Sequence, residues 1–364
     1  AVPIYWFTGG SLHALRLYNV FLGFFSILIL YRCVALVFPL KTMLGVGAIA
    51  FAATLPMYVA MTAAVNNDGL AVLLILASTL VLLQWMRDQF YAISSLKSSR
   101  QTQRLVVLGL LLGLGLLTKI YAYALLPICL AVVILVGWVQ PRVGSTLQRR
   151  PWQEIGWAIR RSLWTAVPAL LLGLPFWLRN MSLYGVRDLL GLAWHDIVVV
   201  GQPRTGEWIA LHGWVAYSER AMQFTFQSFW GVFGWMGVFM DQRIYLAMLV
   251  FTGIIFIGVL WAVVRLISGP PDTDMDGYQI SVLLLFVVLL VAVLASYVSY
   301  NVKFVQHQGR YLFWGILPIS VVVALGWREV LHPLQGWITG MLAGVLAIAI
   351  AVTSLANGNL DEWT

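Results

Sequence analysis

Residues 282–295 read VLLLFVVLLVAVLA, a run without any polar or charged side chain. The rest of the chain has a similar character, since 61% of its 364 residues are hydrophobic and only 10% are charged. A soluble domain carries about 25% charged residues, so this composition excludes one. Long apolar runs also exclude an outer-membrane barrel, whose strands alternate apolar and polar residues. The sequence therefore predicts an all-α protein, a polytopic bundle of transmembrane helices.

The number of spans follows from the length of the apolar runs. A helix crosses the bilayer with about 20 mostly apolar residues, which gives about ten spans in a single transmembrane domain, residues 1–364. The fourth and fifth spans are separated only by Lys119 and Ile120, and they form either a tight helical hairpin or one broken span. The spans are expected at 15–38, 43–62, 69–86, 105–118, 121–139, 162–179, 244–264, 279–300, 311–326 and 334–356.

The basic residues indicate the orientation of the chain. Arginine and lysine favour the cytoplasmic side of a membrane protein, and the stretches 87–104 and 140–161 are rich in them. Placing both stretches in the cytoplasm puts the long segment 180–243 and the loop 301–310 on the extracytoplasmic side. Topology thereby explains the net charge of +8, and we expect no nucleic-acid partner. The outer segments contain most of the different kinds of polar residue. We therefore expect the functional site on the extracytoplasmic face.

Three basic residues of the outer side are candidates for binding a lipid phosphate, namely Arg310, Lys119 and Lys303. Arg310 opens the ninth span within the run QHQGRY, residues 306–311. Its guanidinium matches the geometry of phosphate oxygens, and a helix N-terminus favours anions. The alternative is that such side chains only anchor span ends in the headgroup layer. We favour phosphate binding for Arg310, whereas for Lys119 anchoring is the simpler interpretation.

The segment 180–243 is expected to contain amphipathic or re-entrant elements. Its run SFWGVFGWM, residues 228–236, indicates either an aromatic belt at the interface or a re-entrant element that lines a lipid groove. Glycine permits close approach, and aromatic faces pack against isoprenoid or sugar. The preceding stretch, 205–227, is predicted as an amphipathic helix on the membrane surface. On the groove interpretation, the substrate would contact Trp230, Trp235, His307, Tyr311 and Asp68.

Acidic residues on the outer side are candidates for catalysis. Asp196 follows His195, a pair that can transfer protons or bind a metal, and Glu207 lies in the same segment. No second histidine stands three or four positions from His195, so no recognised metal-binding spacing is present. Asp68 follows two asparagines, where capping of the next helix is the commoner role. We predict no specific metal site, and a divalent metal cofactor is left open.

Several of these elements occur together in one order along the chain. The runs are RLYN at 16–19, AVNNDG at 64–69, TK at 118–119, SFWG at 228–231 and QGRYL at 308–312. In this order they resemble a family of uncharacterised bacterial polytopic membrane proteins related to the GT-C glycosyltransferases. The resemblance extends over nearly the whole chain. It is carried mainly by the aromatic-glycine and Gln-Gly-Arg-Tyr elements.

The resemblance implies a GT-C-like fold in the bacterial inner membrane. It implies transfer of a sugar from a polyprenyl-phosphate donor to an extracytoplasmic acceptor of the cell envelope. In such enzymes arginine, lysine or sometimes a divalent metal stabilises the phosphate that leaves. A carboxylate acts as general base toward the acceptor hydroxyl.

One feature of the family is missing from its expected place. In GT-C enzymes the catalytic acid usually lies in the first outer loop, and this chain begins with what matches a later span. We therefore expect an N-terminal segment, or a partner membrane subunit, to supply that residue, and Asp196 and Glu207 are the candidate substitutes. The alternative function is that of a non-catalytic membrane subunit within a larger assembly.

Overall fold

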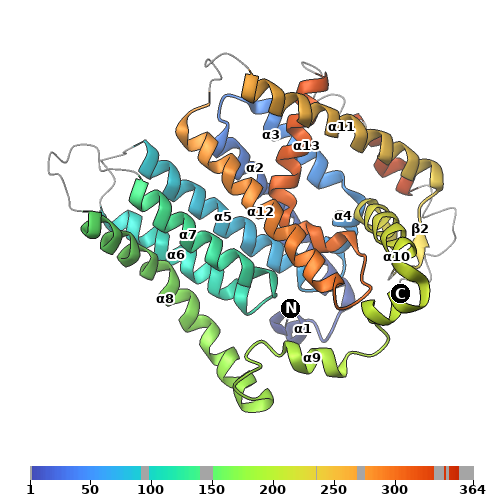
Figure 1. The fold of residues 1–364 in the computed structure, drawn as a ribbon, viewed down its shortest axis with the longest axis horizontal. Helices are drawn as coiled ribbons and strands as arrows, with labels where there is room; N and C mark the ends of the chain where they lie inside the picture. The colour runs from blue at the N-terminus through green and yellow to red at the C-terminus, as the bar shows by residue number, and fades with distance from the viewer. Residues whose placement is uncertain are drawn as a thin grey trace. The chain divides into compact units, whose positions relative to one another are not determined.

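The protein is described here from a computed structural model. The structure describes residues 2–91, 98–139, 151–234, 236–268, 275–331, 340–341 and 344–351. Almost all of these residues are helical, as the long apolar runs predict, and they form a multi-pass helical bundle (Figure 1). The prediction of an all-α membrane protein is confirmed.

The helices follow one another with short connections. They are α1 (Val2–Phe7), α2 (Leu12–Val37), α3 (Thr42–Thr54), α4 (Pro56–Ala63), α5 (Asp68–Phe90), α6 (Ser98–Leu116), α7 (Tyr121–Val139), α8 (Pro151–Tyr184), α9 (Leu192–Val198), α10 (Thr205–Trp230), α11 (Gln242–Ser268), α12 (Gly277–Asn301), the 3-10 helix η1 (Gly309–Gly315) and α13 (Ile316–Leu331). Strands β1 (Val232–Phe233) and β2 (Val238–Phe239) form a small antiparallel hairpin, with Val232 opposite Phe239.

The helices that can cross a membrane correspond to predicted spans. Within the described residues, seven helices are long and apolar enough, and the bent pair α3 and α4 makes up to eight. This pair bends by 61° because Leu55, the residue before Pro56, is extended rather than helical. The predicted span 105–118 lies in α6, which begins with the polar run SSRQTQR. The predicted span 334–356 lies largely outside the described residues.

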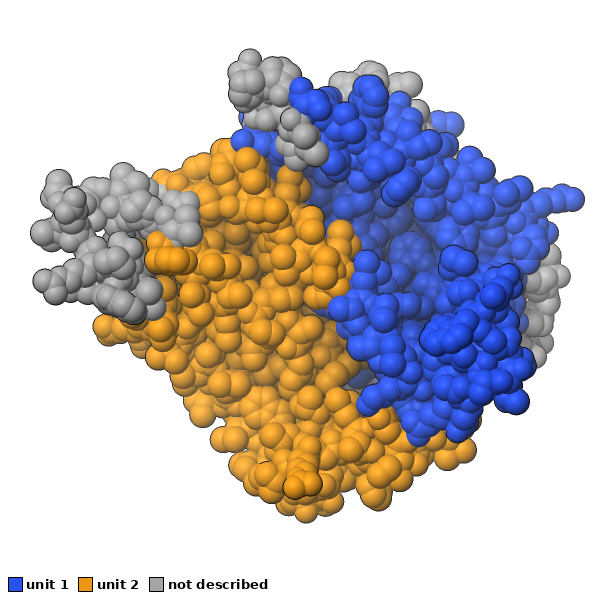
Figure 2. Space-filling view, in the orientation of Figure 1, with its two compact units in different colours: residues 1–69, 204–275, 293–364 blue, residues 70–203, 276–292 orange. Residues whose placement is uncertain are grey.

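The chain divides into two compact units, shown in different colours in Figure 2. Unit 1 comprises residues 1–69, 204–275 and 293–364, and unit 2 comprises residues 70–203 and 276–292. Helices α5 and α12 contribute residues to both units.

Unit 2 is built around α6, α7 and α8, which pack against one another. Helices α6 and α7 form a hairpin whose turn includes a hydrogen bond from the Lys119 backbone N–H to the Gly115 carbonyl oxygen, at 3.0 Å. Of the two predicted arrangements of this region, the hairpin is therefore the correct one. Helix α8 lies so close to α6 that a Cβ on Gly109 would be 2.4 Å from the carbonyl oxygen of Thr165.

Unit 1 contains the pairs α11 with α13 and α3 with α13. The first pair meets at two glycines, since a Cβ on Gly258 would be 2.1 Å from the Gly326 carbonyl oxygen. Such small residues let the backbones of membrane helices approach closely. Helix α10 contains the amphipathic stretch predicted at 205–227 and is kinked at Gly213, where φ is 82°. Its C-terminal end packs against η1 and α4 and thereby assembles the candidate site.

Candidate functional site

Most of the residues predicted for the site belong to unit 1. They lie in α10, in the loop that follows α12, in η1 and at the start of α5, namely Glu207, Trp230, Lys303, His307, Arg310, Tyr311 and Asp68. Lys119 and Asp196 belong to unit 2. Trp235 lies outside the described residues.

The two most specific motifs, SFWG and QGRY, are in direct contact. The backbone N–H of Gly309 donates a hydrogen bond to Ser228 Oγ at 2.7 Å. A Cβ on Gly309 would be 2.3 Å from the backbone nitrogen of Phe229, so only glycine fits at this position. The end of α10 and the start of η1 are thus held together by a close backbone contact. We call this contact between Ser228, Phe229 and Gly309 the α10–η1 junction.

Asn301 connects the start of α10 to the loop before η1. Its carbonyl oxygen accepts hydrogen bonds from Thr205 Oγ1 at 2.8 Å and from the Tyr217 hydroxyl at 2.9 Å. Its side-chain Oδ1 accepts one from the Gln306 backbone N–H at 3.0 Å. A second backbone link runs from the Thr205 N–H to the Lys303 carbonyl oxygen at 3.1 Å. The loop that carries Lys303 and His307 is therefore fixed at both ends.

His307 is buried inside this arrangement, with 4% of its surface exposed. Its ring meets the ring of Tyr217 edge to face, with the ring centres 4.9 Å apart. Neither ring nitrogen has a hydrogen-bond partner within the described part of the chain. Burial, helped by the nearby charge of Arg220, lowers the pKa of His307 to about 4. The imidazole is therefore neutral at physiological pH.

Arg310 lies three residues further along, at the start of η1, and is partly buried. Its guanidinium Nη1 is 3.9 Å from Met61 Sδ, and its Cζ is 5.4 Å from the centre of the Tyr311 ring. The Met61 carbonyl oxygen accepts a hydrogen bond from Asn66 Nδ2 at 3.0 Å. Helix α4 therefore connects Arg310 to the polar turn that precedes Asp68.

Asp68 occupies the first turn of α5, as the capping interpretation predicts. Its backbone N–H donates to Asn66 Oδ1 at 2.8 Å, which closes the turn. A carboxylate in the first turn also complements the helix dipole. Asp68 therefore lies in the same turn as Asn66, which binds the Met61 carbonyl oxygen.

Trp230 is buried at the C-terminal end of α10, next to the α10–η1 junction. It is 5% exposed and packs edge to face against Phe51 and Phe251, with ring centres 6.1 and 5.5 Å away. This burial does not fit a tryptophan of an interfacial belt. Tyr311, in contrast, is partly buried and its ring contacts that of Tyr300 at 5.6 Å.

The candidate acids lie at helix ends. Glu207 is exposed in the first turn of α10. In unit 2, Asp196 lies in α9, and its Oδ1 is 3.4 Å from Nδ1 of His195. The sequence interpretation missed Asp188, whose carboxylate accepts hydrogen bonds from the backbone N–H groups of Ala193 and Trp194 at 3.1 and 2.8 Å. These bonds lower the pKa of Asp188, the bond from Trp194 most of all.

Lys119 lies in the turn between α6 and α7 and is partly buried. Its Nζ is 5.4 Å from the centre of the Tyr121 ring, a cation–π contact. This contact fits the anchoring interpretation and leaves the ammonium group at the end of the hairpin.

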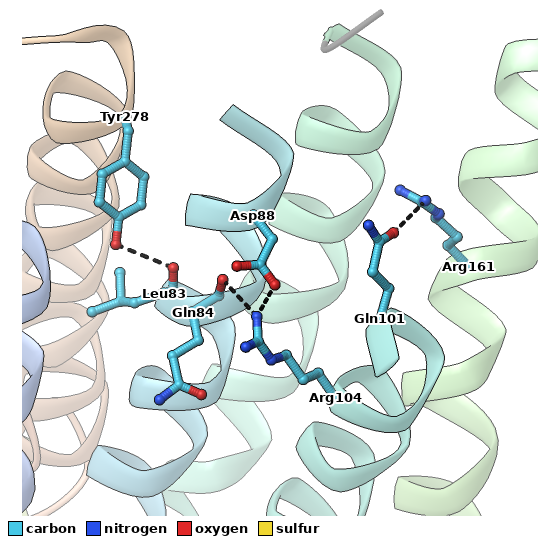
Figure 3. A network of polar contacts seen from close by, with 7 residues as sticks. All are labelled: Leu83, Gln84, Asp88, Gln101, Arg104, Arg161 and Tyr278. Atoms are coloured by element: carbon cyan, nitrogen blue, oxygen red, sulfur yellow. Dashed lines mark hydrogen bonds and ion pairs between the residues drawn. The ribbon is translucent and has the colours of Figure 1, made fainter. Parts of the chain in front are cut away.

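A separate polar cluster lies in unit 2, on the side predicted to be cytoplasmic (Figure 3). Asp88, 2% exposed, pairs with Arg104, and Arg104 Nη1 also donates to the Gln84 carbonyl oxygen at 3.1 Å. Arg161 donates to Gln89 Oε1 at 2.7 Å and to Gln101 Oε1 at 2.9 Å. The contacts connect α5, α6 and α8, so this cluster stabilises the packing of unit 2.

Within the described residues, no group of three or more His, Cys, Asp and Glu side chains is arranged to hold an ion.

Part of the chain is similar to a known protein family. Residues 4–149 match the family model of the dolichyl-phosphate-mannose-protein mannosyltransferases. The matched range contains Asp68 and Lys119, and it relates the N-terminal part of the chain to the GT-C glycosyltransferases, as the sequence motifs indicate. No curated protein matches the chain.

Among solved structures, the chain is similar to the Archaeoglobus fulgidus oligosaccharyltransferase crystallised with a tethered acceptor peptide. The two share 14% identity with a TM-score of 0.46, over 93% of this chain and 43% of that chain. The present chain therefore spans less than half the length of that protein.

Proposed function

We propose that the protein is an integral membrane glycosyltransferase of GT-C type. It moves a sugar from a polyprenyl-phosphate donor to an acceptor on the extracytoplasmic face of the bacterial inner membrane. The observation that carries this proposal is the α10–η1 junction, which sets Arg310 and His307 beside the aromatic end of α10. The family match supports it, because that family is named for a sugar donor linked to a lipid phosphate.

The roles of the residues follow from the chemistry of the transfer. The acceptor oxygen forms a bond to the anomeric carbon, and the bond from that carbon to the phosphate oxygen breaks. The electron pair of the broken bond stays on the polyprenyl phosphate, whose growing negative charge needs fixed positive charge nearby. Arg310 provides this charge through a donor fork that matches phosphate oxygens, with Lys303 of the same unit as a further cation.

The proton of the acceptor hydroxyl must go to a base. Asp196 and Glu207 are the candidates within this chain, and the alternative source is an N-terminal segment or a partner subunit. Trp230, Trp235, Tyr311 and Asp68 shape the groove for the polyprenyl chain and the sugar. The bilayer itself is the route by which the lipid donor reaches the site.

The proposal is tested with purified protein in nanodiscs and short-chain polyprenyl phosphates esterified with mannose, glucose or galactose. We expect Arg310→Ala to lower the transfer rate at least about 100-fold, since one charged donor at a developing anion contributes about that much. Arg310→Lys retains the charge but not the fork, so it should recover part of the activity. Arg243→Ala, an exposed arginine at the start of α11, is the matched control and should leave transfer unchanged.

Two results would contradict the proposal. One is a wild-type protein that neither binds nor transfers from any of these donors. The other is an Arg310→Ala variant that is as active as the wild type. A partner that persists through purification, in an assembly whose activity does not need Arg310, would favour the non-catalytic subunit instead.

A further inference from the structure

His307 is a buried polar side chain of unit 1 with two polar ring atoms, Nδ1 and Nε2. Buried polar groups in proteins nearly always have hydrogen-bond partners. Both ring nitrogens of His307 lack one in the described part of the chain, although the residue is 4% exposed. An unsatisfied buried group is unfavourable, so a protein gains from keeping it only where something else supplies the partner.

The side chain cannot easily leave its position. On one side of His307 in the chain, Phe304 and Val305 are buried. On the other side, Gly309 is locked against Phe229 at the α10–η1 junction. The His307 carbonyl oxygen also lies 3.4 Å from Ser228 Oγ, and the Tyr217 ring covers the imidazole. The backbone at residue 307 is therefore fixed, and the buried position of the His307 ring is part of the folded loop.

We infer that His307 binds the hydroxyl groups of the sugar that the donor carries, and is thus a specificity-determining residue. This inference rests on the function proposed above. A neutral imidazole offers one N–H donor and one nitrogen acceptor. Neighbouring hydroxyls of a sugar ring can satisfy both, because each hydroxyl donates and accepts. An ionised phosphate only accepts and would satisfy the N–H alone.

The charges around His307 favour a neutral ligand at this residue and an anionic ligand at Arg310. Its lowered pKa, caused by burial and by Arg220, keeps the ring uncharged. An anion would gain more from the guanidinium of Arg310, three residues away in the chain, than from a neutral ring. Phosphate recognition thus belongs to Arg310 and sugar recognition to His307, on two ends of one short loop.

The experiment compares two lipids on the same protein. One is a short-chain polyprenyl phosphate, and the other is the same phosphate esterified with the sugar that the wild type binds best. Affinities are measured in nanodiscs for the wild type, His307→Phe, His307→Asn and Arg310→Ala. His307→Phe keeps a planar ring and removes both polar atoms, whereas His307→Asn retains a donor and an acceptor.

We expect His307→Phe to weaken binding of the sugar-bearing lipid about tenfold, the usual scale for lost hydrogen bonds of neutral groups. Binding of the bare phosphate should stay within about twofold, and His307→Asn should recover part of the loss. Arg310→Ala should weaken both lipids. A His307→Phe variant that loses both lipids equally, or neither, would overturn the inference.

A second measurement covers the case in which His307→Phe does not fold. In wild-type protein with ¹⁵N-labelled histidines, the sugar-bearing lipid should shift the nitrogen signals of His307 and the bare phosphate should not. Equal shifts with both lipids, or none, would overturn the inference while the glycosyltransferase proposal stands. A wild type that binds neither lipid would defeat that proposal, and this inference with it.

Discussion

In unit 2 the buried carboxylate of Asp88 is paired with Arg104, whereas in unit 1 the buried imidazole of His307 has no partner within the described residues. The first arrangement holds helices α5 and α6 together, and the second leaves hydrogen-bonding capacity unused. A buried ion pair is a structural feature that is costly to break on one side only. An unsatisfied group in a rigid loop is better explained by a ligand. We therefore treat the paired Asp88 as scaffold and the unpartnered imidazole of His307 as part of the site.

The strongest way to break the site region is to enlarge Gly309. Any Cβ at this position would lie 2.3 Å from a backbone nitrogen of α10, and backbone atoms cannot move aside as a flexible side chain can. We expect Gly309→Val to abolish transfer and to lower the free energy of unfolding by about 3 kcal/mol or more. Thermal melting and the transfer assay check this.

The matched control for that change is Gly253→Ala in α11. A Cβ there meets nothing within 4 Å, and alanine favours the helix over glycine. Its melting temperature should stay the same or rise slightly. If Gly309→Val melted like the wild type, the close contact at the junction would be wrong.

The fold was largely predictable, because a bilayer imposes length and hydropathy on each span. The seven candidate spans within the described residues follow from apolar runs such as 282–295, whereas the bend between α3 and α4 was not predicted. No sequence pattern predicted the contact between the SFWG and QGRY motifs. Their contact requires a residue without a side chain at position 309. The hydropathy pattern does not show this requirement.

Other parts of the site could not be predicted because backbone geometry decides them. Asn301 and Tyr217 belong to no recognisable sequence motif. Their importance comes from the hydrogen bond that the Tyr217 hydroxyl donates to the Asn301 carbonyl oxygen. Asp188 caps α9 from a position before the helix, and no sequence motif marks it. The sequence pattern instead favoured Asp196, the acidic residue next to His195. Trp230 is a candidate for lining the groove, and its packing against Phe51 could not be predicted from the sequence.

The scaffold region should break when one half of its ion pair is removed. We expect Asp88→Ala to lower the free energy of unfolding by about 3 kcal/mol, because Arg104 is left without its partner. Activity per folded molecule should be unchanged if the cluster is only structural. Arg104→Ala and the double variant complete the cycle, and the double should lose less than the sum of the singles. Additive losses would show that the two side chains do not interact.

A milder test measures how the stability of the protein depends on pH. The direction of this dependence follows from the pKa of His307, which is lowered from 6.5 to about 4. The unfolded chain takes up a proton as pH falls through about 6.5, while the folded protein does so only near pH 4. His307 therefore costs stability between these values, by less than about 2 kcal/mol at pH 5. Melting temperatures from pH 7.5 to 4.5 should fall more steeply for the wild type than for His307→Phe. Parallel curves would mean that the imidazole is not held neutral.

The smallest expected effect concerns Ser228, which accepts the Gly309 N–H at 2.7 Å. Ser228→Ala leaves that buried N–H without its acceptor and should cost about 1 kcal/mol of stability. Ser218→Ala, on the exposed side of the same helix, should cost nothing measurable.

Transfer should fall by more than the loss of folded protein explains, because the junction positions both Arg310 and His307. If Ser228→Ala reduced stability but left transfer per folded molecule intact, the junction would belong with the Asp88 cluster as scaffold. The unsatisfied imidazole would then need another explanation.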